Sequence, residues 1–271
     1  MGAIAVIAMT HPPVNAFGAQ LRTELFAAIS AADDAPDIDA IVLHGSGRGF
    51  SAGGDITEFN TPAAAAWPGL SSDLHPRMEA CRKPVIAAVH GLCMGGGLET
   101  AMVCHARVVA FDAALALPEV RVGALALSGT QRLPRLIGLE PAATWIANGD
   151  RLPLACVRAL ADRVVDDSGE AAVVSAAMDF ARDRSIAMPS GSLVRHRPVL
   201  GLDRLNAVRE MAEMAPDGGV RCALLAVLAA AEEADFEGGL ARARALYEGW
   251  IRSPDAMALQ RAFIDRKTSR T

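Results

Sequence analysis

The sequence has few of the features that mark a metal, nucleic-acid or membrane protein. Its five cysteines form no Cys-x-x-Cys pair and its six histidines no pair at ligand spacing, so no metal site is expected. The net charge is −5 and no stretch is strongly basic, which argues against a nucleic-acid partner. No apolar run approaches the roughly 18 residues of a membrane span. The start, "MGAIAVIAMTHPP", lacks the basic region of a signal peptide. We therefore expect a cytoplasmic protein with reduced thiols and no membrane partner.

Two catalytic or binding motifs are incomplete. The stretch "HGLCMGGG" resembles a glycine-rich loop of hydrolases, but no Gly-x-Ser-x-Gly follows it. The stretch "GRGFSA" fits a dinucleotide-binding pattern through Gly47, Gly49 and Ala52, but Gly-Gly-Asp follows where that pattern needs a helix. Neither a serine nucleophile nor dinucleotide binding is therefore the preferred interpretation.

The chain does contain an alternation of buried strands and amphipathic helices. Its 271 residues are 52% hydrophobic and 21% charged, which suits one large core, alone or with an appendage. The runs "AIAVIAM" and "IDAIVLHG" predict buried strands, and Leu21, Leu25 and Ile29 lie at helical spacing between them. A helix over 74–82, a strand in "KPVIAAVHG", a helix from Gly96 and one strand over "RVVAFDAALAL" follow. The first part is thus predicted to be α/β.

From "TQRLPRLIG" onward the chain changes to helices. They are predicted over 173–183, 202–214, 221–233 and 240–252. The segment "AMPSGSLVRHRPVLG" is rich in turn-forming residues and predicts a linker. We therefore divide the chain into a sheet-bearing core, 1–195, and a helical region, 196–271.

The stretch "CMGGGLETAM", residues 93–102, places three consecutive glycines before Glu99. Each glycine destabilises a helix or strand by roughly 0.5–1 kcal/mol relative to alanine, so the triplet needs a reason. A helix that starts near Gly96 has N–H groups without helical partners and a partly positive end. Without side chains there, a ligand carbonyl that becomes negative can approach these groups. The alternative is that the glycines only let a helix end pack tightly against a strand.

A second small-residue loop, "GFSAGGD", follows the strand "IVLHG" as the glycine triplet follows "PVIAAVHG". Two separate loops can each supply one N–H donor to the same carbonyl oxygen, which is what an oxyanion hole requires. The alternative is that Gly53 and Gly54 only form a turn.

Two carboxylates, Glu99 and Glu119, lie among apolar residues. A predicted helix, a strand and the segment "AALALP" separate them, and such a stretch can return Glu119 to the vicinity of Glu99. Two neighbouring buried carboxylates can hold a proton or a water, which is an arrangement for general acid–base catalysis. The alternative is that one or both point to solvent.

The segments "FSAGGDI", "KPVIAAVHGLCMGGGLETAMVCHARVV", "LPEV" and "GTQRLPRLIG", in this order and spacing, resemble the crotonase superfamily of enoyl-CoA hydratases and isomerases. The tail "ALQRAFIDRKTSR" resembles the end of the hydratase/isomerase part of multifunctional β-oxidation enzymes. The resemblance implies a crotonase-like spiral of ββα units with a C-terminal helical region. It also implies an acyl-CoA site within 1–195, a role for 196–271 in oligomerisation or active-site cover, and a homotrimer or hexamer. No cofactor is expected, because coenzyme A enters as part of the thioester substrate.

The resemblance also implies roles for individual residues. The N–H groups of Ala52 and Gly96 correspond to the oxyanion hole, and Glu99 and Glu119 to the catalytic pair. The implied substrate-binding residues are Ser51, Gly53, Gly54, Asp55, Ile56 and Gly95, with Phe263 and Lys267 closing over the acyl chain and the phosphates.

The implied activity is hydration of the C2–C3 double bond of a 2-enoyl-CoA. One alternative is a Δ3,Δ2-enoyl-CoA isomerase, with Glu119 as the proton carrier. A second is a catalytically weak acyl-CoA-binding homologue. The second is motivated by "GALALSGTQ" after Glu119, which is one residue shorter than the family pattern and lacks its Pro-Gly.

Overall fold

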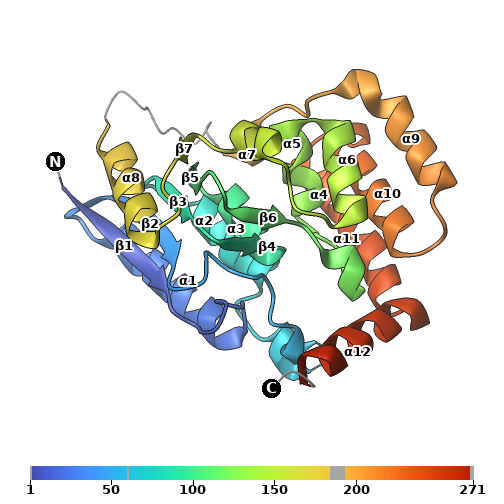
Figure 1. Ribbon diagram of the computed structural model, residues 1–271, viewed down its shortest axis with the longest axis horizontal. Coiled ribbons are helices and arrows are strands. Elements are labelled where there is room, and N and C mark those ends of the chain that lie inside the picture. Colours follow the sequence, from blue (N-terminus) through green and yellow to red (C-terminus); the bar gives the residue numbers. More distant parts are fainter. Residues whose placement is uncertain (1, 60, 184–192, 269–271) are drawn as a thin grey trace. The chain divides into compact units, whose positions relative to one another are not determined.

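The computed structural model describes residues 2–59, 61–183 and 193–268 (Figure 1). These residues form two compact units. The first unit comprises the chain up to Leu115 together with Leu152–Val194, and the second comprises Ala116–Arg151 and the chain from Arg195 onward. The predicted division into 1–195 and 196–271 differs from these units, because 116–151 groups with the C-terminal helices. The assignment of an acyl-CoA site to one region and of oligomerisation or cover to the other stays a prediction.

A five-stranded parallel sheet forms the centre of the first unit. Its strand order is β1 (Ala3–Met9), β2 (Ile38–Gly45), β3 (Val85–Val89), β5 (Ala106–Ala110) and β7 (Arg163–Val165). Nearly all of β2, β3 and β5 is buried, as expected for apolar parallel strands covered on both faces. Helix α1 (Ala19–Asp34) packs against β1 and β2, and α8 (Glu170–Arg182) against β2, β3 and β5 (Figure 1). The predicted α/β core is confirmed.

The single strand predicted over "RVVAFDAALAL" is wrong, because the structure has two strands there. Strand β5 ends at Ala110, and the Ala113 N–H turns back to donate to the Ala110 carbonyl at 3.1 Å. The chain continues in β6 (Ala114–Ala116), which pairs with β4 (Leu92–Met94) in a separate two-stranded sheet. Both strands are apolar and buried, so hydrophobic periodicity does not reveal the turn between them.

Most predicted helices are present with shifted ends. Helix α3 spans Gly96–Val103, and α9 (Leu205–Met214), α10 (Gly219–Glu232) and α11 (Phe236–Ile251) follow in the second unit. The helix predicted over 74–82 is instead a π-helical turn, Leu70–Leu74, followed by the short α2, His75–Glu79. Residues 187–192 of the predicted linker lie outside the described residues.

Helix α10 is the centre of the second unit. It packs against α4 (Gly129–Arg132), α6 (Leu139–Asn148), α9 and α11. Its buried positions are mostly alanine, valine and leucine, which let neighbouring helices approach closely. The remaining helices are α5 (Pro134–Ile137) and α12 (Pro254–Thr268) in this unit and α7 (Leu154–Leu160) in the first. Within the described ranges, no helix combines the length and apolarity needed to cross a membrane.

Candidate active site

The loop at 51–54 and the start of α3 pack directly against each other. The Ser51 N–H donates to the Leu92 carbonyl at 3.0 Å, and the Met94 N–H donates to the Ser51 carbonyl at 2.9 Å. Gly95 then turns the chain into α3 at φ +54, a conformation that favours glycine. A Cβ atom on Gly97 would lie 3.0 Å from the Ser51 carbonyl carbon and closer still to its oxygen. Gly97 is therefore required for close packing.

Gly96 has a different environment, because its missing Cβ would meet the end of a side chain and lie near the nitrogen of a residue in the other loop. A Cβ atom on Gly96 would lie 3.5 Å from the Gly54 nitrogen, 3.7 Å from Gly53 Cα and 2.7 Å from Leu70 Cδ2. Among the described residues, no hydrogen bond is made by the N–H of Gly54 or of Gly96. Gly96 also occupies the partly positive first position of α3. Two backbone nitrogens from separate loops thus lie near the same point, an arrangement that is compatible with an oxyanion hole.

The oxyanion role of Ala52 stays a prediction. The Ala52 N–H already donates to the Val14 carbonyl at 2.9 Å. A ligand oxygen would have to break that bond to accept from Ala52. Gly54, two residues on, is the residue of this loop whose nitrogen lies near Gly96. Gly54 is therefore a second candidate donor in this loop, beside the predicted Ala52.

The substrate-binding role of Ser51 stays a prediction. Ser51 is fully buried, with 0% exposure. Its hydroxyl donates to the Asn15 carbonyl at 2.6 Å and accepts from the Gly53 N–H at 3.1 Å. Ser51 therefore stabilises the conformation of the loop through these two hydrogen bonds.

Asn15 is a supporting residue that the sequence reasoning missed. It has φ +52, and its Nδ2 donates to the Ser46 and Gly49 carbonyls, both at 3.0 Å. It thereby anchors the chain that leads into the 51–54 loop. The available signal was an asparagine just after the Pro12-Pro13 turn, because asparagine tolerates the left-handed region better than most residues.

Asp55 and Ile56, both half-buried, continue the loop into a short 3-10 turn, Ile56–Glu58. The Asp55 carboxylate caps this turn by accepting from the Thr57 N–H at 3.0 Å and the Thr57 hydroxyl at 2.7 Å. Gly53 and Gly95 are buried and have positive φ, so both shape the backbone of the site. Direct contacts of these four predicted residues, and of Gly54, with a substrate stay predictions.

His44 and His90 are far apart in the sequence, but both lie close to one carboxylate. His44 Nδ1 lies 3.3 Å and His90 Nε2 4.0 Å from the carboxylate of Glu170, at the start of α8. The Gly47 N–H donates to Glu170 at 2.8 Å, and the Gly47 carbonyl lies 3.2 Å from His90 Nε2. These contacts hold the chain that precedes the 51–54 loop. No group of three or more His, Cys, Asp or Glu in the described part of the chain is arranged to hold a metal.

Glu99 and Glu119 occupy different units. Glu99 lies in the first turn of α3 and is 6% exposed, so the alternative that it points to solvent is wrong. Glu119 is half-buried and starts the 3-10 turn Glu119–Val122, with its carbonyl accepting from the Ala124 N–H at 2.9 Å. Since each unit is described by itself, the meeting of the two carboxylates at one water stays a prediction.

Helix α12 is fastened to the turn that carries Glu119. Gln260, which is 3% exposed, donates from Nε2 to the Gly123 carbonyl at 2.9 Å, and Gly123 ends the turn at φ +69. Phe263 lies on the same helix, half-buried, with the Arg266 guanidinium carbon 6.0 Å from the centre of its ring. Lys267 is in α12, but its side chain lies outside the described part of the chain. The closing roles of Phe263 and Lys267 stay predictions.

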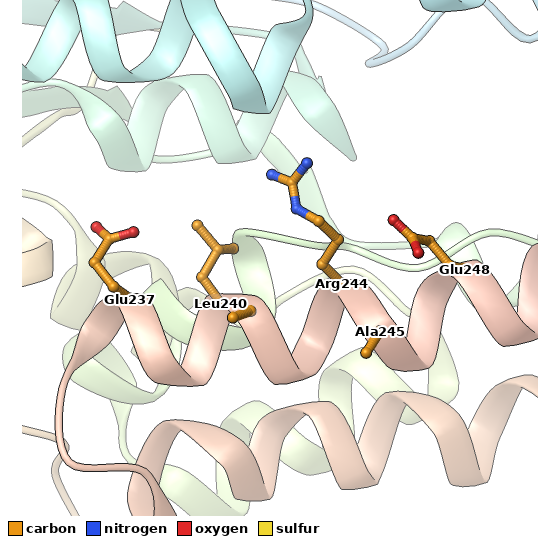
Figure 2. A pocket seen from close by; sticks show the side chains of 6 residues that line it. Glu237, Leu240, Arg244, Ala245 and Glu248 are labelled. Atoms are coloured by element: carbon orange, nitrogen blue, oxygen red, sulfur yellow. The ribbon is translucent and has the colours of Figure 1, made fainter.

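A separate cavity of about 300 Å³ lies along α11. It is lined by Glu237, Leu240, Ala241, Arg244, Ala245 and Glu248. Figure 2 shows Glu237, Arg244 and Glu248 projecting from the helix. The lining includes none of the predicted site residues, so we do not assign the thioester to it.

Comparisons with known proteins identify the family of the chain. The family model described as enoyl-CoA hydratase/isomerase matches residues 1–166. The match covers more than half of the chain, and the chain therefore belongs to this family.

Individual relatives carry related descriptions. The probable enoyl-CoA hydratase of Bacillus subtilis (strain 168) is 40% identical over 152 residues, covering 54% of this chain and 59% of that protein. The peroxisomal bifunctional enzyme of Danio rerio is 35% identical over 274 residues, covering 98% of this chain and 37% of that protein. The chain thus spans less than two thirds of the length of either curated relative.

A solved structure confirms the predicted crotonase-like fold. The carnitinyl-CoA hydratase from Mycobacterium avium superposes with a TM-score of 0.70 at 25% identity, covering 98% of this chain and 94% of that chain. A second structure, EchA1_1 from Mycobacterium paratuberculosis, superposes with a TM-score of 0.66 at 25% identity, over 97% and 93% of the two chains.

Proposed function

We propose that this protein is an enoyl-CoA hydratase, which adds water across the C2–C3 double bond of a 2-enoyl-CoA thioester. The observation that carries the proposal is the pair of backbone donors, Gly54 and Gly96, whose nitrogens lie near the same point at the start of α3. Glu99 is buried in the same helical turn. Membership of the enoyl-CoA hydratase/isomerase family supports this assignment.

In the proposed reaction the thioester carbonyl oxygen accepts hydrogen bonds from the N–H groups of Gly54 and Gly96. As water attacks C3, negative charge develops on that oxygen. Each well-placed donor stabilises the charged state by about 3–4 kcal/mol. Glu99 takes a proton from the water, and Glu119 donates a proton to C2. The hydroxyl ends on C3 and the hydrogen on C2, so the reaction needs no redox cofactor; coenzyme A belongs to the substrate.

The test is hydration of crotonyl-CoA, followed by loss of the enoyl-thioester absorbance. Glu99→Gln and Glu119→Gln should each lower kcat by about 10²-fold or more, because each removes one proton-transfer group. Their thermal unfolding should remain close to that of the wild type. A wild-type protein that binds crotonyl-CoA without converting it would contradict the hydratase and identify the acyl-CoA-binding alternative.

The isomerase is the second candidate, because the matching family model describes hydratases and isomerases together. In that case Glu119 carries the proton between C4 and C2. Assaying the same variants with a 3-enoyl-CoA separates the two activities. Isomerisation that persists in Glu99→Gln and disappears in Glu119→Gln would favour the isomerase over the hydratase.

We also propose a homotrimer or hexamer that acts in the cytoplasm on free acyl-CoA, with no nucleic-acid or membrane partner. The net charge of −5 argues against binding to nucleic acid or to an anionic membrane, because like charges repel. Relatives described as peroxisomal make the compartment worth testing. Light scattering after size-exclusion chromatography measures the assembly, and a monomer would contradict this part of the proposal.

A further inference from the structure

The side chain of Leu70 covers the space between the two backbone donors. Its Cδ2 lies 2.7 Å from where a Cβ atom of Gly96 would be, and the Gly54 nitrogen lies 3.5 Å from the same point. Leu70 is half-buried and begins the π-helical turn before α2. A carbonyl oxygen bound between Gly54 and Gly96 would therefore bring its own carbon and the next carbon of the acyl chain close to Leu70.

Leu70 is held by its own turn. The Asp73 carboxylate accepts from the Gly69 N–H at 2.8 Å and from the Ser72 hydroxyl at 2.6 Å. The Leu74 N–H donates to the Gly69 carbonyl at 3.0 Å, and the Leu74 side chain is fully buried. The turn around Leu70 is thus closed at both ends.

A buried arginine fastens the preceding segment to α1. Arg22 is 5% exposed, and its Nε donates to the Pro68 carbonyl at 2.8 Å. Its Nη2 donates to the Ala63 and Ala66 carbonyls at 2.9 and 3.2 Å. Because the guanidinium is planar and offers five N–H donors, one side chain can fix several carbonyls at once. The segment that leads to Leu70 is therefore tied to the sheet-bearing unit.

The chain after Leu70 is tied to the helix that carries Gly96. His75 Nε2 lies 3.0 Å from the Thr100 hydroxyl, and that hydroxyl donates to the Gly96 carbonyl at 2.7 Å. The backbone of Leu70 is thus positioned relative to Gly96 from both sides. Its side chain therefore starts from a fixed position beside Gly96, although its end can still rotate.

We propose that Leu70 is a specificity-determining residue that selects 2-enoyl thioesters without a substituent at C2. The inference rests on the proposed function of the Gly54–Gly96 space. A methyl group at C2 would occupy the volume next to the thioester carbonyl, where Leu70 Cδ2 already lies. A linear chain extends from C3 and does not add volume at that point. A substrate branched at C2 is therefore disfavoured, whereas Leu70 does not discriminate between linear acyl chains of different length.

The experiment compares Leu70→Ala with Leu154→Ala, a matched control because Leu154 lies in the same unit and is 43% exposed. The measured quantity is kcat/KM for crotonyl-CoA, for its 2-methyl derivative tiglyl-CoA, and for linear 2-decenoyl-CoA. Leu70→Ala should raise the tiglyl-to-crotonyl ratio by about tenfold or more, the usual worth of one methyl group in a tight pocket. The decenoyl-to-crotonyl ratio should stay within about twofold, and Leu154→Ala should change neither ratio.

A binding measurement separates failure of this inference from failure of the proposed function. Butyryl-CoA and 2-methylbutyryl-CoA are saturated, so their dissociation constants need no turnover. If Leu70→Ala selectively tightens binding of the branched thioester in a protein that hydrates no enoyl-CoA, the hydratase is refuted and the role of Leu70 stands. If the wild type hydrates crotonyl-CoA and Leu70→Ala changes only the chain-length ratio, or no ratio, the role of Leu70 is refuted. If neither thioester binds, both proposals fall.

Discussion

Adjacent glycines at the start of α3 should respond in opposite ways to alanine. In Gly97→Ala the new Cβ would meet backbone, with the Ser51 carbonyl carbon 3.0 Å away and the oxygen nearer. Ser51 cannot retreat easily, because its carbonyl accepts from the Met94 N–H at 2.9 Å. In Gly96→Ala the nearest atom is Leu70 Cδ2 at 2.7 Å, the end of a side chain that can rotate.

The magnitudes follow from these neighbours. Forcing a methyl group into a closely packed site costs about 1–3 kcal/mol, and a rigid backbone neighbour puts Gly97→Ala at the upper end of that range. Alanine regains about 1 kcal/mol of helix propensity, which leaves a net loss of about 2 kcal/mol. In Gly96→Ala the same gain offsets the shift of Leu70, so stability should stay within about 1 kcal/mol. Its methyl group fills the donor space, which should lower kcat by about 10²–10³-fold, as loss of one oxyanion donor does.

Urea unfolding followed by circular dichroism measures the change in stability. The crotonyl-CoA hydration assay measures the change in kcat. Adding Leu70→Ala to Gly96→Ala should relieve the steric contact without restoring activity, because the Gly96 methyl group still fills the space. Full activity in Gly96→Ala would refute the proposal that the thioester oxygen binds beside Gly96. Wild-type stability in Gly97→Ala would refute the packing argument.

Three further predictions concern charge, positioning and thiol reactivity. Burial raises the pKa of Asp33, but hydrogen bonds from Arg77 and two backbone N–H groups outweigh it, and the net pKa is below the usual value. A carboxyl of this kind stabilises the fold above its unfolded pKa of about 4 and loses that effect as the pH falls through its folded pKa. Asp33→Asn should therefore flatten the acid limb of a stability–pH profile, and an unchanged limb would refute this role. Gln260→Ala should lower kcat by about tenfold with little change in KM, because it loosens the turn that carries Glu119; a change confined to KM would oppose this. Burial raises the pKa of the Cys104 thiol to about 12, so its alkylation by iodoacetamide at pH 8, read by mass spectrometry, should wait for urea unfolding.

The sequence by itself determined the elements whose signals are local. The apolar runs of β2 and β3 predict buried strands, and the structure has them. Their parallel pairing is a finding of the structure. The glycine triplet predicted that a helix starts at Gly96, and α3 begins there. The apolar neighbours of Glu99 were consistent with its burial. Composition and periodicity sufficed because each of these features depends on residues within a few positions.

Only the tertiary structure decided which atoms of the loops are available. Ala52 and Gly54 are equivalent by spacing, yet the Ala52 N–H is engaged by Val14, a residue brought to it by the fold. Leu70 gave no sequence signal, because its place beside Gly96 follows largely from bonds made by Arg22 and Thr100, which are distant from it in the chain. A backbone donor is free or occupied according to partners that are distant in sequence, and local patterns contain no record of those partners.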